Sequence, residues 1–498
     1  MQTSINQYVW DLYLRSGGSD TVEFFEKELS PDITEEYAEK IREFQSYYTI
    51  SNALIEYTQE SIKEAINYFS SNEDHDESLE NTDETIDDIL GEIWDVYAEE
   101  LGNNVSDKDI FAEAAYNLPY FSTVEAAYGS TDIIPYYFWC NFNVLTIIAN
   151  AFEIELPPLP QKKEYRSRFF YYGELCKAFN DYREINNWSK SELLAFLYDF
   201  APKYIGGTDS YIIKDLPEPR SAFFIGGGGN NGDEKAEDDP NEIVCWQCNP
   251  DTRAGDMIVM YLRTPISSIS SVWRSCSIGF NDPFFFYYRC TFIGNPIKGH
   301  RIGIDKIKKD KILSKMPVVS KNLQGINGVE LKPSEYNHIL DITKIKAERL
   351  EDAADLGAGE YVNEKAVEDA IIKPLIAKLG YSSYDYETQT RIPVGNHNTL
   401  LIPDFVLSPT KKGRYTFAYA IIEAKRSIVK VEELNDALGQ ARSYALELSV
   451  RYAAVASQEG IWITSVEDKY NEVIYHQTWD RLKDADDFMK LRGYLEKR

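Results

Sequence analysis

The sequence predicts a multidomain α+β protein, and three changes of pattern along the chain predict it. Residues 1–205 carry the periodicity of amphipathic helices, residues 206–348 carry short apolar runs of strand type, and residues 349–498 alternate helical and strand patterns. A length of 498 residues favours about three domains. The glycine pair at 206–207 and the acidic, glycine-containing stretch at 351–360 mark the two boundaries.

The first part is expected to be an all-helical domain. Helical periodicity is clearest at residues 34–53, 86–101 and 189–200, and the polar, acidic residues 71–84 are predicted to form a loop. Residues 1–200 hold 39 acidic and 13 basic side chains, a net charge of −26. Because phosphate binding depends on Lys and Arg, we expect this domain to serve regulation, a partner or a homodimer rather than nucleic acid.

The middle part is expected to be built from short strands. Residues 201–350 hold 18 acidic and 20 basic side chains, so this part of the chain has a slight excess of positive charge, whereas the rest is acidic. The basic run at 298–321 is interpreted as an edge that contacts phosphates, with a solvated surface as the alternative. The strands are predicted at residues 222–225, 243–246, 255–262, 266–273, 284–293, 313–319 and 323–328.

The last part carries a pattern of charged residues on two strand-like runs. Asp404 stands at the first run, and Glu423 and Lys425 end the second. Because residues two apart share one face of a strand, Lys425 is expected beside the Glu423 carboxylate. Two carboxylates suit Mg²⁺, with Mn²⁺ as a substitute, and a nearby ammonium can position the water that such a metal activates.

Two helices are predicted on either side of these strands. One begins after Asn363, carries Glu364 and Glu368 one turn apart, and ends at Gly380, a residue typical of helix ends. The other, downstream, places two polar side chains four residues apart and therefore on one face, Gln440 and Tyr444. Strands are predicted to follow at residues 452–456 and 460–464.

Residues 360–480, with these elements in this order, resemble the PD-(D/E)xK nuclease superfamily, most closely the nuclease domain of type I restriction motor subunits and RecB-type nucleases. The resemblance implies an α/β restriction-endonuclease-like domain. It also implies that Asp404, Glu423 and the Ala424 carbonyl bind Mg²⁺ and that Lys425 acts on the water.

The same resemblance assigns supporting roles to the two flanking helices. Glu364 would support the metal or its water, with Glu368 as the alternative. Gln440 and Tyr444 would contact the DNA backbone or brace the site, although Tyr444 is equally well interpreted as a packed aromatic residue.

The middle part resembles a second family. Trp246, the Gly255-Asp256 pair before an apolar strand, and the late Asn322-Leu-Gln-Gly segment resemble PUA-like β-barrels, most closely EVE-type domains that bind modified bases. A base read in this way leaves the stack and lies between aromatic faces. The resemblance implies a modified-base pocket, with the alternative that the aromatic residues are barrel core; its candidates are Trp246, Trp273, Asn230, Tyr287 and Tyr288.

Several other sites are disfavoured. The glycine run at 226–229 is not followed by Gly-Lys-Ser/Thr, so no ATP motor is expected in this chain. A zinc site is disfavoured because the cysteines lack a second close pair; the four concerned are Cys245, Cys248, Cys276 and Cys290.

His397 is expected in a loop or near Asp404. Six cysteines in 498 residues, with no signal peptide or membrane-spanning run, favour the cytoplasm.

Together these patterns predict a type IV-like, modification-dependent restriction endonuclease. It would hydrolyse DNA phosphodiester bonds with Mg²⁺ after recognising a modified base, in defence against phage or foreign DNA. Two alternatives remain open: a nuclease that acts on RNA or unmodified DNA with the barrel as a nucleic-acid-binding module, and a non-catalytic binding protein with an inert nuclease fold.

Overall fold

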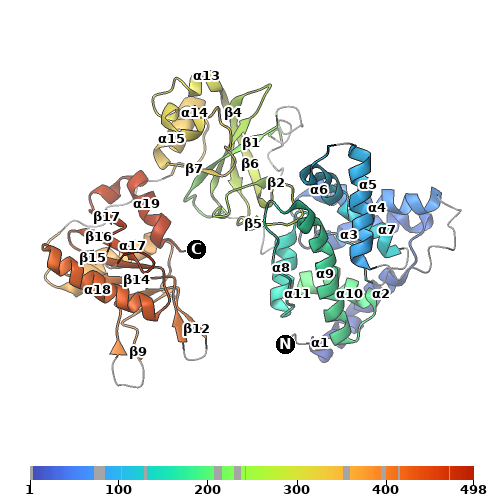
Figure 1. The fold of residues 1–498 in the computed structure, drawn as a ribbon, viewed down its shortest axis with the longest axis horizontal. Coiled ribbons are helices and arrows are strands. Elements are labelled where there is room, and N and C mark those ends of the chain that lie inside the picture. Colours follow the sequence, from blue (N-terminus) through green and yellow to red (C-terminus); the bar gives the residue numbers. More distant parts are fainter. Residues whose placement is uncertain are drawn as a thin grey trace. The chain divides into compact units, whose positions relative to one another are not determined.

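The computed structural model is mixed α+β, with a helical N-terminal region and a curled sheet in the middle of the chain (Figure 1). It forms two compact units, Met1–Leu331 with Leu340–Glu348, and Lys332–Ile339 with Arg349–Arg498. Residues 72–84 of the loop predicted at 71–84 lie outside the described residues, as do Asn230 and His397, whereas Ser71 ends helix α4. The structure describes residues 4–71, 85–102, 104–127, 132–206, 216–228, 237–239, 241, 243–350, 359–393, 400–412, 415–469 and 472–497.

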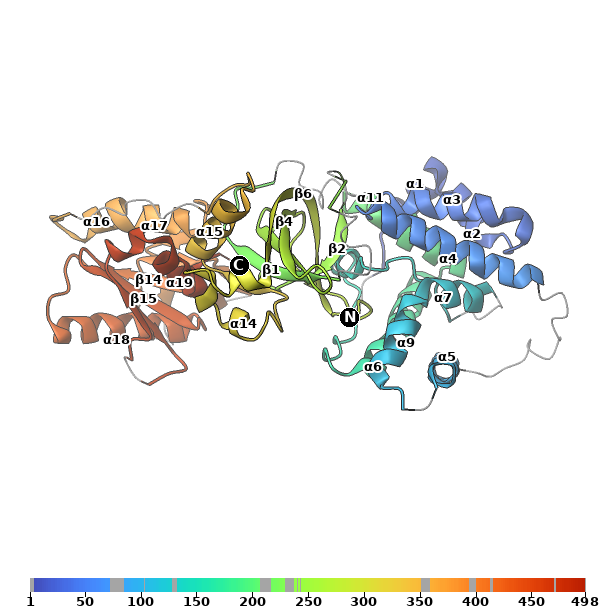
Figure 2. The same ribbon diagram turned by 90° about the horizontal axis from the view of Figure 1, so that it is seen from above.

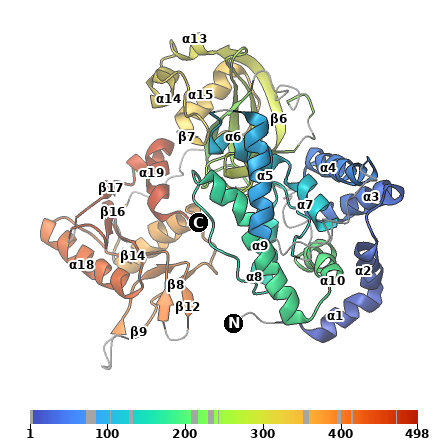
Figure 3. The ribbon, with the colours of Figure 1, turned by 45° about the vertical axis from the view of Figure 1, so that its right-hand side comes forward.

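The N-terminal region is helical, and in Figures 1 and 3 the long helix α9 runs through it beside α5 and α6. Its core is rich in aromatic residues, with Trp10, Phe111 and Tyr172 among the fully buried side chains. No helix in the described ranges is both long and apolar enough to cross a membrane. The helices are α1 (Gln7–Tyr13), α2 (Ser19–Glu26), α3 (Thr34–Gln45), α4 (Asn52–Ser71), α5 (Ile86–Leu101), α6 (Asp107–Tyr116), α7 (Leu118–Ala127), α8 (Phe142–Ala151), α9 (Tyr165–Asn186), α10 (Lys190–Ala195), η4 (Phe196–Phe200) and α11 (Ala201–Tyr204).

One predicted helix is divided in the structure. The helix predicted at 34–53 ends at Gln45, and α4 starts only at Asn52. The reason is local, because the Ser51 hydroxyl accepts a hydrogen bond from the Leu54 N–H and so starts a new helix. The helices predicted at 86–101 and 189–200 are confirmed as α5 and as α10 with η4.

The middle of the chain forms a curled seven-stranded sheet, seen from above in Figure 2. The strand order is β2-β6-β4-β3-β1-β7, with β5 paired to β6; β1 and β3 are parallel and the other pairs are antiparallel. The strands are β1 (Ala222–Gly227), β2 (Val244–Gln247), β3 (Met257–Leu262), β4 (Ser268–Ser275), β5 (Phe280–Asn281), β6 (Arg289–Gly303) and β7 (Val329–Leu331).

Two of the predicted strands in this region are wrong, and the start of a third is misplaced. Residues 313–319 form the short turns η6 (Leu313–Lys315) and α14 (Pro317–Ser320), since Pro317 favours the first turn of a helix. Residues 323–328 form a loop. The strand predicted at 284–293 begins only at Arg289, because residues 283–286 pack against the helices instead of joining the sheet. Two further helices follow β6 and β7, α13 (Ile304–Ile307) and α15 (Pro333–Thr343).

A buried arginine joins the helical region to the sheet region. Arg168 on α9 is fully buried, and its guanidinium donates to the carbonyl oxygens of Pro283 at 2.8 Å and Phe285 at 2.6 Å. A third donor reaches the Lys162 carbonyl at 3.0 Å. The Phe284 ring is buried within the aromatic core of the helices. The segment before β6 is therefore part of the helical core.

A buried carboxyl beside this junction makes stability depend on pH. Burial raises the pKa of Asp282 to about 7, and hydrogen bonds from the N–H groups of Phe284 and Phe285 oppose the shift. The folded protein therefore loses stability as the pH rises from about 4 to above 7, because it must ionise a carboxyl that the unfolded chain ionises freely.

We expect Asp282→Asn to stabilise the protein by about 2 kcal/mol at pH 8 and to have little effect at pH 4. The gain is smaller than the pKa shift alone implies, because Arg168 loses a favourable charge. Urea unfolding at both pH values measures it. A gain of equal size at pH 4 would show that ionisation is not the cause.

The second unit contains a six-stranded sheet with the order β17-β16-β15-β14-β11-β8. Helix α18 covers one face, and α17 and α19 cover the other (Figure 2). The strands of the whole unit, four of which form two separate pairs (β10-β9 and β12-β13), are β8 (Tyr386–Thr388), β9 (Ile392–Pro393), β10 (Leu400–Leu401), β11 (Phe405–Leu407), β12 (Thr410–Lys412), β13 (Tyr415–Phe417), β14 (Ala420–Ala424), β15 (Tyr452–Ser457), β16 (Gly460–Ser465) and β17 (Tyr475–Gln477). Its helices are α16 (Glu364–Val367), η7 (Glu368–Ile372), α17 (Lys373–Lys378), α18 (Val431–Glu447), η8 (Arg481–Lys483) and α19 (Ala485–Leu495).

Candidate active site

The register of three strands brings Asp404 and Glu423 together. Phe405 pairs with Ile422 on β14 and with Thr388 on β8. One residue further along, the same registers place Asp404 between Glu423 and Gln389. Residues directly opposite one another in an antiparallel pair lie on one face, with Cβ atoms about 5 Å apart. Two carboxylates thus meet at the end of the strand pair.

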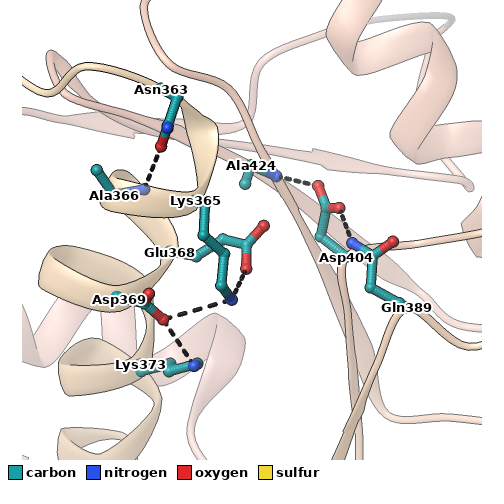
Figure 4. A network of polar contacts seen from close by, with 9 residues as sticks. All are labelled: Asn363, Lys365, Ala366, Glu368, Asp369, Lys373, Gln389, Asp404 and Ala424. Atoms are coloured by element: carbon teal, nitrogen blue, oxygen red, sulfur yellow. Dashed lines mark hydrogen bonds and ion pairs between the residues drawn. The ribbon is translucent and has the colours of Figure 1, made fainter.

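Both carboxylate oxygens of Asp404 are held in place. The Gln389 amide donates to one oxygen at 2.7 Å, and the Ala424 N–H donates to the other at 2.8 Å (Figure 4). Each oxygen keeps a lone pair for another partner. Gln389 was not among the predicted site residues, and it was missed because only the pairing of β8 with β11 brings it beside Asp404.

Glu423 is a buried carboxylate with one unsatisfied oxygen. Its side chain is 3% exposed, and Oε1 accepts from the Lys425 ammonium at 2.9 Å. Among the residues that the structure describes, Oε2 has no hydrogen-bond partner. Burial raises the pKa of Glu423 to about 7, and the charge of Asp404 adds to this shift while Lys425 opposes it. In the described part of the chain, the Lys425 ammonium pairs with Oε1 and no cation pairs with Oε2.

Lys425 stays a cation at this site. Burial by itself lowers the pKa of its ammonium, but the hydrogen bond and charge of Glu423, with the charges of Glu364 and Asp404, raise it above the ordinary value. The backbone N–H of Lys425 donates to the Ala456 carbonyl at 2.9 Å, which anchors the residue beside β15. A charged ammonium can donate to a water or a phosphate, but it cannot accept a proton.

The first helix presents its two candidate glutamates differently. The Asn363 side chain caps the helix by accepting from the Ala366 N–H at 2.9 Å. Glu368 is buried and pairs with Lys365 at 2.7 Å, in the network that Figure 4 draws beside the strand end of Asp404. Glu364 is exposed, and its charge acts on Lys425. Of the two glutamates, Glu364 is therefore the one whose charge raises the pKa of the predicted catalytic residue Lys425.

Gln440 and Tyr444 lie on α18 and bind each other. The Gln440 amide donates to the Tyr444 hydroxyl at 2.8 Å. Tyr444 is buried in the core between α18 and the sheet, whereas Gln440 is exposed. The aromatic ring thus holds the helix against the sheet face, and the amide is the member of the pair that solvent reaches.

The donor set fits a hard divalent cation. Asp404 and Glu423 supply carboxylate oxygens, and Glu423 Oε2 is a buried acceptor without a partner. In an antiparallel pair a residue directs its N–H and C=O toward the same neighbour, so the Ala424 carbonyl faces the strand of Asp404 as its N–H does. Over the described ranges, no three His, Cys, Asp or Glu side chains form a metal-binding group, so a metal here would rest on two carboxylates.

The predicted base-pocket residues fall into two groups. Trp246 and Trp273 pack in the same apolar cluster of the middle sheet; Trp273 is 1% exposed and donates to the Ser271 hydroxyl at 2.8 Å. Tyr288 instead donates to the Pro160 carbonyl at 2.9 Å and lies under the Arg168 guanidinium. Tyr287 is 37% exposed beside Phe285 and Phe286.

A buried glutamate near Trp273 was not predicted. Glu237 accepts from the hydroxyls of Ser270 at 2.5 Å and Ser271 at 2.7 Å, where a bulge in β4 turns both side chains toward it. Its second oxygen meets no hydrogen-bond partner within the described ranges. An acidic stretch such as residues 233–239 is normally interpreted as solvated, so no sequence signal marks this carboxylate.

Comparison with known proteins yields little. No protein-family model and no curated protein matches the chain. Among solved structures, the NMR structure of Rpa0253 from Rhodopseudomonas palustris is 11% identical, and the match covers 25% of this chain and 93% of that one with a TM-score of 0.21. A likeness this slight carries no argument about fold or function.

Proposed function

We propose that the protein is a Mg²⁺-dependent DNA endonuclease that acts on DNA with modified bases. The observation that carries the proposal is the meeting of Asp404, Glu423 and Lys425 at one strand end, with a buried Glu423 oxygen that lacks a partner. In this proposal the second unit is a restriction-endonuclease-like domain and the curled middle sheet is a PUA-like base reader.

The proposed reaction is hydrolysis of a phosphodiester bond. Asp404, Glu423 and the Ala424 carbonyl would hold Mg²⁺, which when bound polarises the phosphate and favours ionisation of a water. Lys425 donates a hydrogen bond to the attacking water or to a phosphate oxygen and so orients it. Water adds to phosphorus, the P–O bond to one sugar breaks, and the departing oxygen takes up a proton.

The reader function has separate support. Trp246 and Trp273 share one apolar cluster, and Trp246 is half-buried on the edge strand β2. The partly exposed ring of Trp246 can stack on a base that has left the duplex, whereas Trp273 is buried and supports that ring from the cluster. Because one active site cuts one strand, a double-strand break would need either two copies of the chain or two successive nicks, and symmetry is the reason to propose a homodimer.

Cleavage of matched DNAs tests this proposal. Plasmid and phage DNAs that are unmodified, cytosine-methylated, hydroxymethylated or glucosylated are incubated with the protein in Mg²⁺ and in EDTA, with a labelled RNA alongside. We expect Mg²⁺-dependent cutting of a modified DNA only. Equal cutting of every DNA would remove the reader, cutting of RNA alone would change the substrate class, and cutting in EDTA would end the metal assignment.

A further inference from the structure

A cavity of about 400 Å³ opens in the first unit beside the turn between β3 and β4. One wall is formed by Tyr261, Arg263 and Ser267, and the other by residues 322–327. The side chains of the proposed nuclease site and of the predicted base pocket are not among those that line it. The cavity therefore needs an explanation of its own.

The loop at 322–327 lines this cavity and carries backbone N–H groups that meet no acceptor in the described part of the chain. Asn322 and Leu323 adopt φ values of +54° and +60°, which cost energy for residues other than glycine, and Gly325 has φ +73°. Within the described part of the chain, the N–H groups of Gly325, Ile326 and Asn327 meet no acceptor. Successive free N–H groups in a loop with left-handed residues form a concave site for an anion.

Arg263 adds a free cation to the same cavity. The side chain is exposed, and its guanidinium has no hydrogen-bond or ion-pair partner in the described ranges. It lies over the backbone of β1, because a Cβ on Gly226 would be 3.0 Å from the Arg263 Nε. The planar guanidinium fork matches the oxygens of a phosphate group.

A side chain fixes the loop beside Arg263. The Gly226 N–H donates to the Asn327 side-chain oxygen at 2.6 Å, and the Asn327 amide donates to Gln247 at 2.6 Å. These bonds tie the loop to β1 and β2. The free N–H groups and the guanidinium are therefore held in a preformed arrangement, which lowers the entropy cost of binding.

The surroundings of the cavity are basic. The N–H of Ile304, the first residue of α13, donates to the Ser267 carbonyl at 3.0 Å, so α13 starts at the cavity wall. The run from Lys298 to Lys321, which leads into the loop, holds eight Lys and Arg against two Asp in a chain with a net charge of −29. A positive region of this kind attracts a polyanion.

We propose that this cavity binds a phosphate group of the nucleic-acid backbone, with Arg263 and the N–H groups of residues 325–327 as its donors. The shared chemistry is a phosphate anion, which a DNA strand or a free phosphate could supply; the basic run beside the cavity favours DNA. The assignment of DNA rests on the proposed function, whereas the anion site itself does not.

Binding of a fluorescent duplex to the full chain in EDTA, which prevents cutting, tests the proposal. The variants are Arg263→Ala and, as a matched control, Lys346→Ala, an exposed cation of the same unit away from the cavity. We expect Arg263→Ala to weaken binding about tenfold and to lower the slope of log affinity against log salt by about one. Arg263→Lys, which keeps the charge but not the fork, should fall between.

Each of the other possible results rules out a specific part of the proposal. If Arg263→Ala binds DNA as Lys346→Ala does, the phosphate site is wrong while the nuclease proposal stands. If the unaltered chain binds no duplex, the proposed function and the assignment of the cavity to DNA both fail, and the anion site itself is then decided by the measurement with inorganic phosphate. If millimolar inorganic phosphate stabilises the unaltered chain against heat but not Arg263→Ala, and DNA affinity is the same for both, the cavity binds free phosphate and the assignment to DNA is overturned.

Discussion

Asp404→Asn is expected to lower Mg²⁺-dependent DNA cleavage by about 100- to 1000-fold, because a metal-binding carboxylate contributes several kcal/mol to the transition state. The fold should persist. An Asn at this position still accepts from the Ala424 N–H, and Gln389 can turn its amide to offer an oxygen to the new NH₂ group. Initial cleavage rates on the preferred DNA measure the effect, with circular dichroism as the check on folding.

The matched control is Asp436→Asn, which removes an exposed carboxylate from α18 in the same unit. We expect it to cleave at the normal rate. DNA binding in EDTA should also be close to normal in Asp404→Asn, since in the proposed mechanism the lost group holds the metal and does not contact the DNA backbone. An Asp404→Asn protein that cleaves as fast as the control would refute the site assignment.

Arg168→Met is expected to destabilise the first unit by about 3–5 kcal/mol, since it leaves several buried carbonyl oxygens without donors. The arginine is fully buried and donates to the carbonyls of Pro283, Phe285 and Lys162. Met fills part of the same volume but donates nothing. A change of this size corresponds to a fall in Tm of roughly 10 °C, which thermal unfolding measures.

Arg166→Met is the control for this prediction. Arg166 lies two residues earlier on α9, is exposed, and places its guanidinium over the rings of Trp94 and Phe170. Its replacement should cost less than about 1 kcal/mol. Equal Tm values for the two variants would show that the carbonyl contacts of Arg168 do not hold the junction.

Local patterns in the sequence determined much of the second unit. The period of two along a strand predicts that Glu423 and Lys425 share a face, and the two side chains bind each other at 2.9 Å. The helix predicted to begin after Asn363 and end at Gly380 is present, with the Asn363 cap and a φ of +90° at Gly380. These features depend only on neighbours in the chain, which is why the sequence shows them.

Tertiary structure alone decided which distant residues meet. The pairing of β8, β11 and β14 places Gln389 and Glu423 on either side of Asp404, and the chain by itself does not state this register. The Arg168 junction likewise depends on residues more than 100 positions apart. Residues 313–319 have the composition of a strand, yet they form helical turns, because a strand exists only where a partner strand is available. Local sequence therefore determined the elements and the facing of their side chains, and long-range packing decided the site.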